Sequence, residues 1–174
     1  ANLIQAAKDQ VAALTLAAYE QAAAAGALPG GAEIRGTVEI PKDSRNGDFA
    51  TSFAMAGAKA LRSNPRAIAQ TILDHLDLSD SYFERAEIAG PGFLNFFLSP
   101  KWYGAVLQDI EAEGAAYGSS QEGSGEKVMV EFVSANPTGP MHMGNARGGV
   151  LGDTLANVLS RYGCQTWKEF YVND

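Results

Sequence analysis

The chain has 174 residues, of which 46% are hydrophobic, 19% charged and 9% aromatic. This is the composition of a globular protein, and it excludes a disordered or collagen-like chain. The net charge of −7 argues against non-specific binding to nucleic-acid backbones, DNA included, because such binding depends on Lys and Arg. No apolar run approaches the ~18 residues of a membrane-spanning helix. With a single cysteine and no apolar leader, a cytoplasmic location is expected.

Residues 1–117 predict an α+β domain. Apolar residues recur at helical spacing in some stretches and alternate in others, and Gly and Pro separate the stretches. The expected elements are a helix over 2–25, a strand over 34–40, a helix over 49–62 capped by Asp48, a helix from Pro65 capped by Asn64, a hairpin of strands 82–88 and 93–98, and a helix over 101–114. Helices on a small antiparallel sheet would give this domain one core.

The composition changes after residue 117. Residues 118–126 are small and polar and predict a linker. Beyond it, the apolar run 128–133 is typical of a parallel strand covered on both faces. A helix over 145–162 and a strand over 165–172 complete one β-α-β unit. Because such a unit alone cannot cover both faces of its strands, we expect the chain to be part of a longer protein.

The loop over 134–145 is the first candidate for chemistry, because ligands bind at the carboxyl ends of parallel strands. It leads into the N-terminus of a helix, where free N–H groups attract phosphate. Gly144 allows close approach to the backbone. His142 and Asn145 are able to donate hydrogen bonds to charge that develops on a phosphoryl oxygen. A structural role for His142 is the alternative, since neither a P-loop nor a G-x-G-x-x-G pattern is present.

Glu131 interrupts the apolar run that precedes this loop. A buried carboxylate without a partner is costly, so a cation is expected beside it. That cation is either an arginine of the protein or a cationic substrate.

The stretch VEFVSANPTGPMHMGNARGGVLGDTLANVLSRYG, followed by EFYVND, resembles arginyl-tRNA synthetases. Its His-Met-Gly-Asn step resembles the His-Ile-Gly-His motif of class I aminoacyl-tRNA synthetases, and the flanking Ser-x-Asn-Pro and Tyr-Val-Asn-Asp point to the arginine enzyme. Residues 47–51, 64–69 and 90–97 resemble the appended N-terminal domain of that family. The resemblance implies an α+β N-terminal domain followed by the first β-α-β unit of a Rossmann-like nucleotide-binding domain, here incomplete.

The resemblance also implies a reaction, in which arginine and ATP form arginyl-adenylate and the arginyl group passes to tRNA(Arg). Mg²⁺ would accompany ATP, and no resident metal is expected. By position in the motifs, the arginine-binding residues would be Glu131, Ser134 and Asn136. The ATP-binding residues would be His142, Gly144 and Asn145, with His142 and Asn145 acting in catalysis. Phe93 and Asn95 would contact a base in the tRNA D-loop.

Two features leave questions within the resemblance. Asn145 stands where the family motif has its second His; it keeps an N–H donor but cannot become cationic. Tyr171, Asn173 and Asp174 match the family's strand-end residues, and ordinary strand-end polarity is the alternative.

The Lys-Met-Ser-Lys-Ser loop and the helical anticodon-binding domain of the family do not occur in this chain. We therefore expect no aminoacylation by the chain alone, together with self-association through its uncovered apolar surface. The alternative functions are a stand-alone tRNA-binding module and a related nucleotidyltransferase with another substrate.

Overall fold

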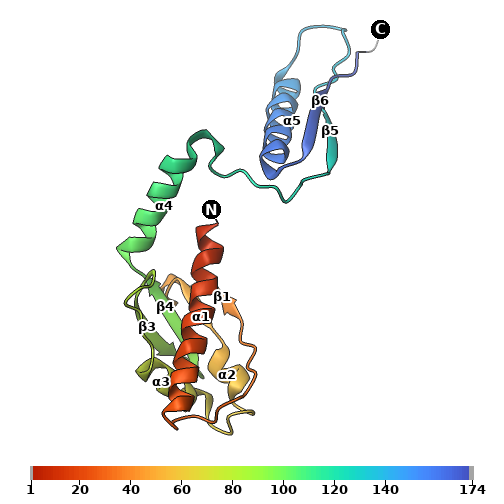
Figure 1. Ribbon diagram of the computed structural model, residues 1–174. Helices are drawn as coiled ribbons and strands as arrows, with labels where there is room; N and C mark the ends of the chain where they lie inside the picture. The colour runs from red at the N-terminus through yellow and green to blue at the C-terminus, as the bar shows by residue number, and fades with distance from the viewer. Residues whose placement is uncertain (1, 173–174) are drawn as a thin grey trace. The chain divides into compact units, whose positions relative to one another are not determined.

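A computed structural model describes residues 2–172. The chain forms two compact units, Ala1–Ala112 and Glu113–Asp174 (Figure 1). Unit 1 combines helices with a four-stranded sheet, and unit 2 is a β-α-β arrangement with a two-stranded sheet. The predicted succession of an α+β region and a β-α-β region is therefore present.

The sheet of unit 1 is antiparallel, with strand order β1-β2-β4-β3. Its strands are β1 (Val38–Glu39), β2 (Phe49–Thr51), β3 (Phe83–Ala89) and β4 (Phe93–Leu98). The hairpin β3–β4 was predicted from the two apolar runs around Gly90-Pro91-Gly92, and it is confirmed. Gly92 has φ +140°, and a side chain there would meet Pro65 at 2.9 Å, so this turn requires glycine.

Helices α1 (Leu3–Ala24), α2 (Phe53–Gly57) and α3 (Pro65–Asp74) pack on one face of this sheet (Figure 1). The predicted cap of the helix from Pro65 is confirmed, since the Asn64 side chain accepts a hydrogen bond from Arg66 N. The structure adds a cap that was not predicted, at the start of α1, where the Asn2 side chain accepts from Gln5 N. Alternate residues of β4, Leu94 and Phe96, are fully buried in the core. The largest of the other fully buried side chains come from α1 and α3, namely Val11, Thr15, Ile68 and Ile72. The core thus lies between the helices and one side of the sheet.

Two predicted elements of unit 1 are wrong in extent or type. The helix expected over 49–62 is instead β2 followed by the short α2 and turns, and Asp48 accepts a hydrogen bond from Leu98 N (2.8 Å) rather than capping a helix. Phe49 pairs with Phe96 across the sheet, so tertiary pairing overrides local helix preference. The strand expected over 34–40 is limited to the two residues of β1. Just before it, Thr37 N donates to the Ser52 hydroxyl instead of to a backbone carbonyl of a neighbouring strand.

Helix α4 (Pro100–Glu113) follows the hairpin as predicted and ends in the 3₁₀ turn Gly114–Ala116. The Trp102 indole donates to Leu3 O (3.2 Å), which ties the start of α4 to α1. No residue of α4 is buried.

Unit 2 contains β5 (Lys127–Glu131), α5 (Met143–Tyr162) and β6 (Gln165–Glu169), with the two strands paired in parallel. Gly163 ends α5 in the left-handed conformation at φ +107°, as the sequence predicted. In the segment 118–126, Ser120 N and Gly123 N donate to Arg161 O and Tyr162 O. These residues therefore lie against the end of α5.

Candidate functional site

The N-terminus of α5 is closed by a reciprocal pair of side-chain hydrogen bonds. His142 is the N-cap, and its Nδ1 accepts from Gly144 N (3.1 Å). The Asn145 Oδ1 accepts in return from His142 N (3.0 Å). This is a capping box in which His and Asn take the places usually filled by Ser or Thr and Glu or Gln.

The capping box determines which hydrogen-bond donors remain available. Because Nδ1 of His142 accepts a hydrogen bond, the neutral ring carries its proton on Nε2. Because Oδ1 of Asn145 is the acceptor, its NH₂ group remains a donor. Two N–H groups at the positive end of a 20-residue helix are thus able to donate hydrogen bonds to an anion.

These two side chains share one hollow with part of the preceding loop. The hollow has a volume of about 250 Å³ and is lined by Ala135, Asn136, Thr138, Gly139, Pro140, Met141, His142 and Asn145. Three of the predicted site residues, Asn136, His142 and Asn145, therefore meet at one place. All three are open to solvent, with the Asn145 side chain half-buried.

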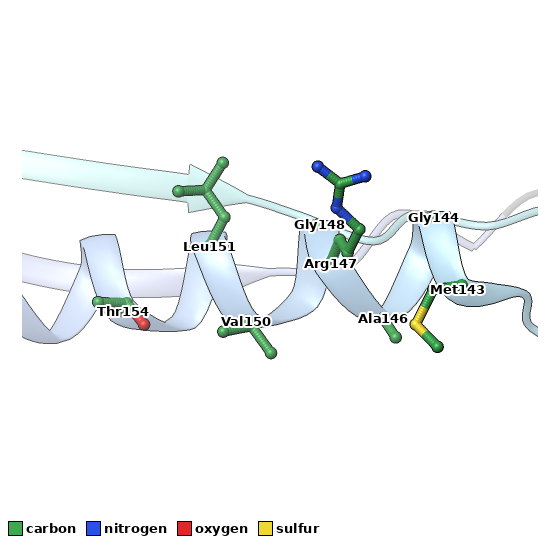
Figure 2. Close-up of a pocket in the computed structure, with 8 residues that line it drawn as sticks. All are labelled: Met143, Gly144, Ala146, Arg147, Gly148, Val150, Leu151 and Thr154. Carbon is green, nitrogen blue, oxygen red and sulfur yellow. The ribbon is translucent and has the colours of Figure 1, made fainter.

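Gly144 also borders a shallow depression on the outer side of α5, and a side chain at this position would meet the His142 ring at 2.9 Å. Figure 2 shows Arg147 and Leu151 projecting from one side of this helix and Met143, Ala146 and Val150 from another. Every residue that lines this shallow depression belongs to α5, so it is an open helix face. Both Val150 and Leu151 are about 70% exposed (70% and 72%).

Glu131 and Ser134 form a second cluster with the end of β6. The Ser134 hydroxyl donates to Glu131 Oε1 (2.8 Å) and accepts from Tyr171 N (3.1 Å). The expectation that Glu131 is buried is wrong, because its side chain is exposed. Within residues 2–172, α5 is the helix that packs closely on this two-stranded sheet, so Val128 and Val130 are half-buried while the alternate residues of β5 remain exposed. The prediction that residues 128–133 form a strand covered on both faces is likewise wrong within the described residues, where one face of β5 is exposed.

The turn between β5 and the loop adopts a conformation that the sequence did not reveal. Val133 and Ser134 have φ values of +68° and +39°. A β-branched residue rarely occupies this region, and doing so costs on the order of 1–3 kcal/mol. The turn places the Ser134 hydroxyl between the ends of both strands. Of the family-matched strand-end residues, Asn173 and Asp174 lie outside the described residues.

Unit 1 carries a separate hollow of about 390 Å³ on its sheet. It is lined by Glu39, Pro41, Lys42, Asp43, Asn46, Ala50, Ala89, Gly90, Pro91, Phe93 and Asn95. Phe93 and Asn95 were predicted as a pair, and alternation along β4 directs both to the face opposite the core. Ala50 and Glu87 are the cross-strand partners of Asn95. These neighbours come from strands whose register could not be derived from local sequence.

The Asn95 side chain is the distinctive polar group of this hollow. The residue is only 5% exposed, yet its amide makes no hydrogen bond to any group of residues 2–172. Its polar atoms are not among those fully sealed from solvent. A mostly buried amide that retains both donor and acceptor capacity, beside the Phe93 ring, suits an unpaired base.

Charge around this hollow is balanced locally. Arg45 forms a salt bridge with Asp43 (2.6 Å), and this hydrogen-bonded partner lowers the pKa of the Asp43 carboxyl from its usual value. Arg66 donates to Gly90 O (2.8 Å) at the β3–β4 turn. Lys59 and Arg62 are exposed on the segment after α2.

A search of residues 2–172 finds no group of three or more His, Cys, Asp or Glu side chains arranged to hold a metal ion. No helix in the same range is long and apolar enough to cross a membrane.

Comparison with known proteins links both units to one family. The model for the arginyl-tRNA synthetase N-terminal domain matches residues 3–98. The arginine–tRNA ligase of Acetivibrio thermocellus is 47% identical over 173 residues, which are 99% of this chain and 31% of that protein. The ligase of Caldanaerobacter subterraneus is 45% identical over the same length. The chain thus spans just under a third of the length of these relatives.

A solved structure shows the same fold at low sequence identity. The arginyl-tRNA synthetase of Plasmodium falciparum superposes with a TM-score of 0.53 at 16% identity, over 95% of this chain and 30% of that one. Together with the match of the N-terminal domain model to more than half of the chain, the two relatives identify the protein. The chain belongs to the arginyl-tRNA synthetase family and corresponds to its N-terminal part.

Proposed function

We propose that this chain is the tRNA-recognising and ATP-contacting N-terminal part of an arginine–tRNA ligase. In the complete enzyme, the arginine carboxylate attacks the α-phosphorus of ATP and diphosphate leaves, which gives arginyl-adenylate. A ribose hydroxyl at the tRNA(Arg) 3′ end then attacks the arginyl carbonyl and AMP leaves. The family membership of the chain supports this assignment.

The observation that carries the proposal is the pair of free N–H donors at the start of α5. Phosphoryl transfer depends on positioning and on stabilising charge at the phosphoryl oxygens, and it needs no nucleophile from the protein. His142 Nε2–H and Asn145 NH₂ supply such donors, and the absence of a side chain at Gly144 leaves room for the His142 ring. Mg²⁺ bound to the ATP phosphates would supply further positive charge.

The capping box also explains how Asn145 replaces the second His of the family motif. The cap needs an acceptor for His142 N, and the Asn145 oxygen provides one at 3.0 Å. The amide still keeps its NH₂ donor. We infer that the replacement of His by Asn preserves one neutral hydrogen-bond donor at this position and removes a side chain that is able to become cationic.

For arginine, we propose that Glu131, Ser134 and Asn136 contact the α-amino end of the substrate. Among residues 2–172, the exposed Glu131 carboxylate has only a hydroxyl partner, Ser134, so it retains acceptor capacity for an ammonium group. Ser134 holds this carboxylate beside the end of β6. The exposure of Glu131 means that the attraction depends on the rest of the catalytic domain to exclude water.

A chimaera tests these roles, in which this chain replaces the matching segment of the Acetivibrio thermocellus ligase. His142→Ser keeps a good N-cap but removes the ring N–H, so arginine-dependent ATP–diphosphate exchange should fall about 10²–10³-fold. Met141→Ala, in the same hollow, is the matched control and should leave exchange within about threefold. Unchanged exchange in His142→Ser would overturn the proposed catalytic role. Exchange driven by another amino acid would favour the alternative nucleotidyltransferase.

The chain alone should show no exchange activity, even with tRNA(Arg) added, because it spans only 31% of its relative. Its second candidate function is to bind tRNA on its own, which the hollow around Phe93 and Asn95 favours. Phe93→Ala and Asn95→Ala should each weaken binding of a fluorescent tRNA(Arg) transcript about fivefold or more, as the loss of one stacked or hydrogen-bonded base implies. Steady ATP–diphosphate exchange by the chain alone would contradict the expectation that it is inactive.

A further inference from the structure

The face of the unit 1 sheet that carries Phe93 and Asn95 continues past the hollow. Alternation along β4 puts Phe97 on the same side, two residues beyond Asn95, while Leu94 and Phe96 enter the core. Residues two apart on a strand face are about 7 Å apart. Three side chains suited to RNA bases, two aromatic rings and an amide, therefore stand in one row.

The Phe97 ring is covered by a guanidinium group. Arg85 is its cross-strand partner, and Cζ of Arg85 lies 3.7 Å from the centre of the Phe97 ring. Glu84 and Glu87 hold the guanidinium at 2.7 Å and 3.0 Å. The Arg85 side chain is nevertheless 49% exposed, so part of its planar surface remains open to solvent.

From this row of side chains we propose that the sheet face binds two consecutive unpaired nucleotides of tRNA(Arg) rather than one. One base enters the hollow at Phe93 and Asn95, and its neighbour stacks on the open face of the Arg85 guanidinium, which lies in turn on Phe97. Guanidinium planes are established stacking partners for unpaired RNA bases, and aromatic residues on the open face of a four-stranded sheet hold two or three bases in RNA recognition motifs. The inference rests on the proposed tRNA-binding function and extends it by a second subsite.

The ion pairs of Arg85 indicate stacking rather than phosphate binding. Two carboxylates within 3.0 Å already neutralise the guanidinium, so an incoming phosphate would meet them as well. Stacking uses the plane of the group and leaves both ion pairs intact. A lysine would keep the charge but has no plane, so Arg85→Lys separates the two roles.

The test measures binding of the full chain to a fluorescent tRNA(Arg) transcript by polarisation at fixed moderate salt. Arg85→Lys should weaken binding about five- to 20-fold, which is the effect of losing one stacked base. Phe97→Leu removes the ring beneath the guanidinium and should weaken binding in the same direction. The matched control is Arg35→Lys, because Arg35 also pairs with a neighbouring glutamate (2.7 Å) but is not among the residues that line the hollow. It should leave affinity unchanged.

Transcripts with single abasic nucleotides across the D-loop locate the second base. One abasic position should lie next to the base that contacts Phe93. With the transcript that lacks this base, Arg85→Lys and the unchanged chain should bind with equal affinity, whereas Phe93→Ala should still weaken binding. If Phe93→Ala and Asn95→Ala weaken binding but Arg85→Lys and Phe97→Leu do not, the second subsite is overturned and the proposed function stands. If none of the four affects binding, the tRNA-binding function itself fails.

Discussion

The two units differ most in how completely they bury their apolar side chains. Of the fully buried apolar residues in the described chain, all but Ala156 belong to unit 1. Unit 2 leaves large apolar side chains exposed on both of its strands and along α5, among them Met129, Val150, Leu151, Val158 and Trp167. Unit 1 is thus a closed folding unit, whereas much of the apolar surface of unit 2 is open to solvent.

This contrast bears on function as well. The hollow at Phe93 and Asn95 is built entirely on the closed unit, so its residues are held in place by a complete core. The donors at His142 and Asn145 are positioned by the capping box, but Glu131, in the separate cluster at the strand ends, is exposed to water. RNA binding is therefore expected from the chain as it stands, and chemistry only from the complete enzyme.

The largest effect should come from opening the core of unit 1. Phe96 is fully buried and its ring meets the edge of Phe83 at 5.4 Å between centroids, so Phe96→Ala should destabilise unit 1 by about 3–5 kcal/mol. Urea unfolding followed by Trp102 fluorescence in a Trp167→Phe background measures this unit alone. Phe97→Ala is the matched control, because the neighbouring ring lies on the opposite face of the sheet, half-buried beneath Arg85; it should cost about 1 kcal/mol or less. Equal losses from the two variants would contradict the assignment of the sheet faces.

The exposed face of α5 should control the solubility of the chain. The double variant Val150→Gln, Leu151→Gln replaces two side chains that are about 70% exposed (70% and 72%) with good helix formers. Self-association, followed by sedimentation velocity over a range of concentrations, should weaken at least about tenfold because two apolar groups leave the contact. Leu16→Gln on α1, at 47% exposure in the closed unit, should change nothing. If the unsubstituted chain is already monomeric, the exposed apolar surface of unit 2 does not drive self-association, and this part of the contrast between the units is wrong.

Local sequence rules were sufficient where an element is specified by its own residues. The caps at Asn2 and Asn64, the Gly-Pro-Gly turn and the left-handed Gly163 each act within a few positions, and the helices and hairpin they delimit were predicted. Prediction failed at Phe49, whose helical spacing with later residues is overridden by pairing with Phe96, 47 positions away. Non-local pairing of this kind leaves no periodic signal in the sequence.

For the site, the sequence identified residue types but not their surroundings. The motif placed His142 and Asn145 at a helix start, yet their reciprocal hydrogen bonds depend on backbone geometry. Glu131 was expected to be buried because an apolar run normally indicates cover on both faces, and the described chain supplies cover on one. Alternation along β4 would have indicated Phe97, but its pairing with Arg85 needed the strand register.

The capping box should contribute a smaller, separable amount of stability to unit 2. His142→Ala removes the acceptor for Gly144 N and should cost about 1 kcal/mol. His142→Ser restores a capping side chain and should recover most of that loss, although its effect on diphosphate exchange in the chimaera persists. Urea unfolding monitored by Trp167 in a Trp102→Phe background gives the stability. Identical stabilities for the Ala and Ser variants would show that the cap is not what holds His142 in place.

The smallest effect concerns the ion pair that joins α5 to β6. Lys168 Nζ lies 2.5 Å from Asp153 Oδ1, and this hydrogen bond lowers the pKa of the Asp153 carboxyl from its usual value of 3.8. A carboxyl whose pKa is lower in the folded state stabilises that state at neutral pH, and the contribution disappears as the pH falls through the folded pKa. Asp153→Asn should therefore lower the melting temperature slightly at pH 7 and make no difference once the pH has fallen below the pKa of this carboxyl in the folded state.

The salt dependence of the melting temperature shows whether Asp153→Asn acts through the lost charge or through altered packing. Both side chains are about half exposed (44% and 52%), so 1 M NaCl should screen most of the difference between Asp153→Asn and the unchanged chain at pH 7. Melting curves by circular dichroism at both salt concentrations provide the measurement. Asn157 donates to Asp153 and accepts from Lys168, so the amide introduced at 153 still has a neighbour with which to hydrogen-bond. A difference that persists at low pH and high salt would mean that Asp153 orders the helix through this polar contact rather than through its charge, and that even the open unit relies on local geometry more than on ion pairing.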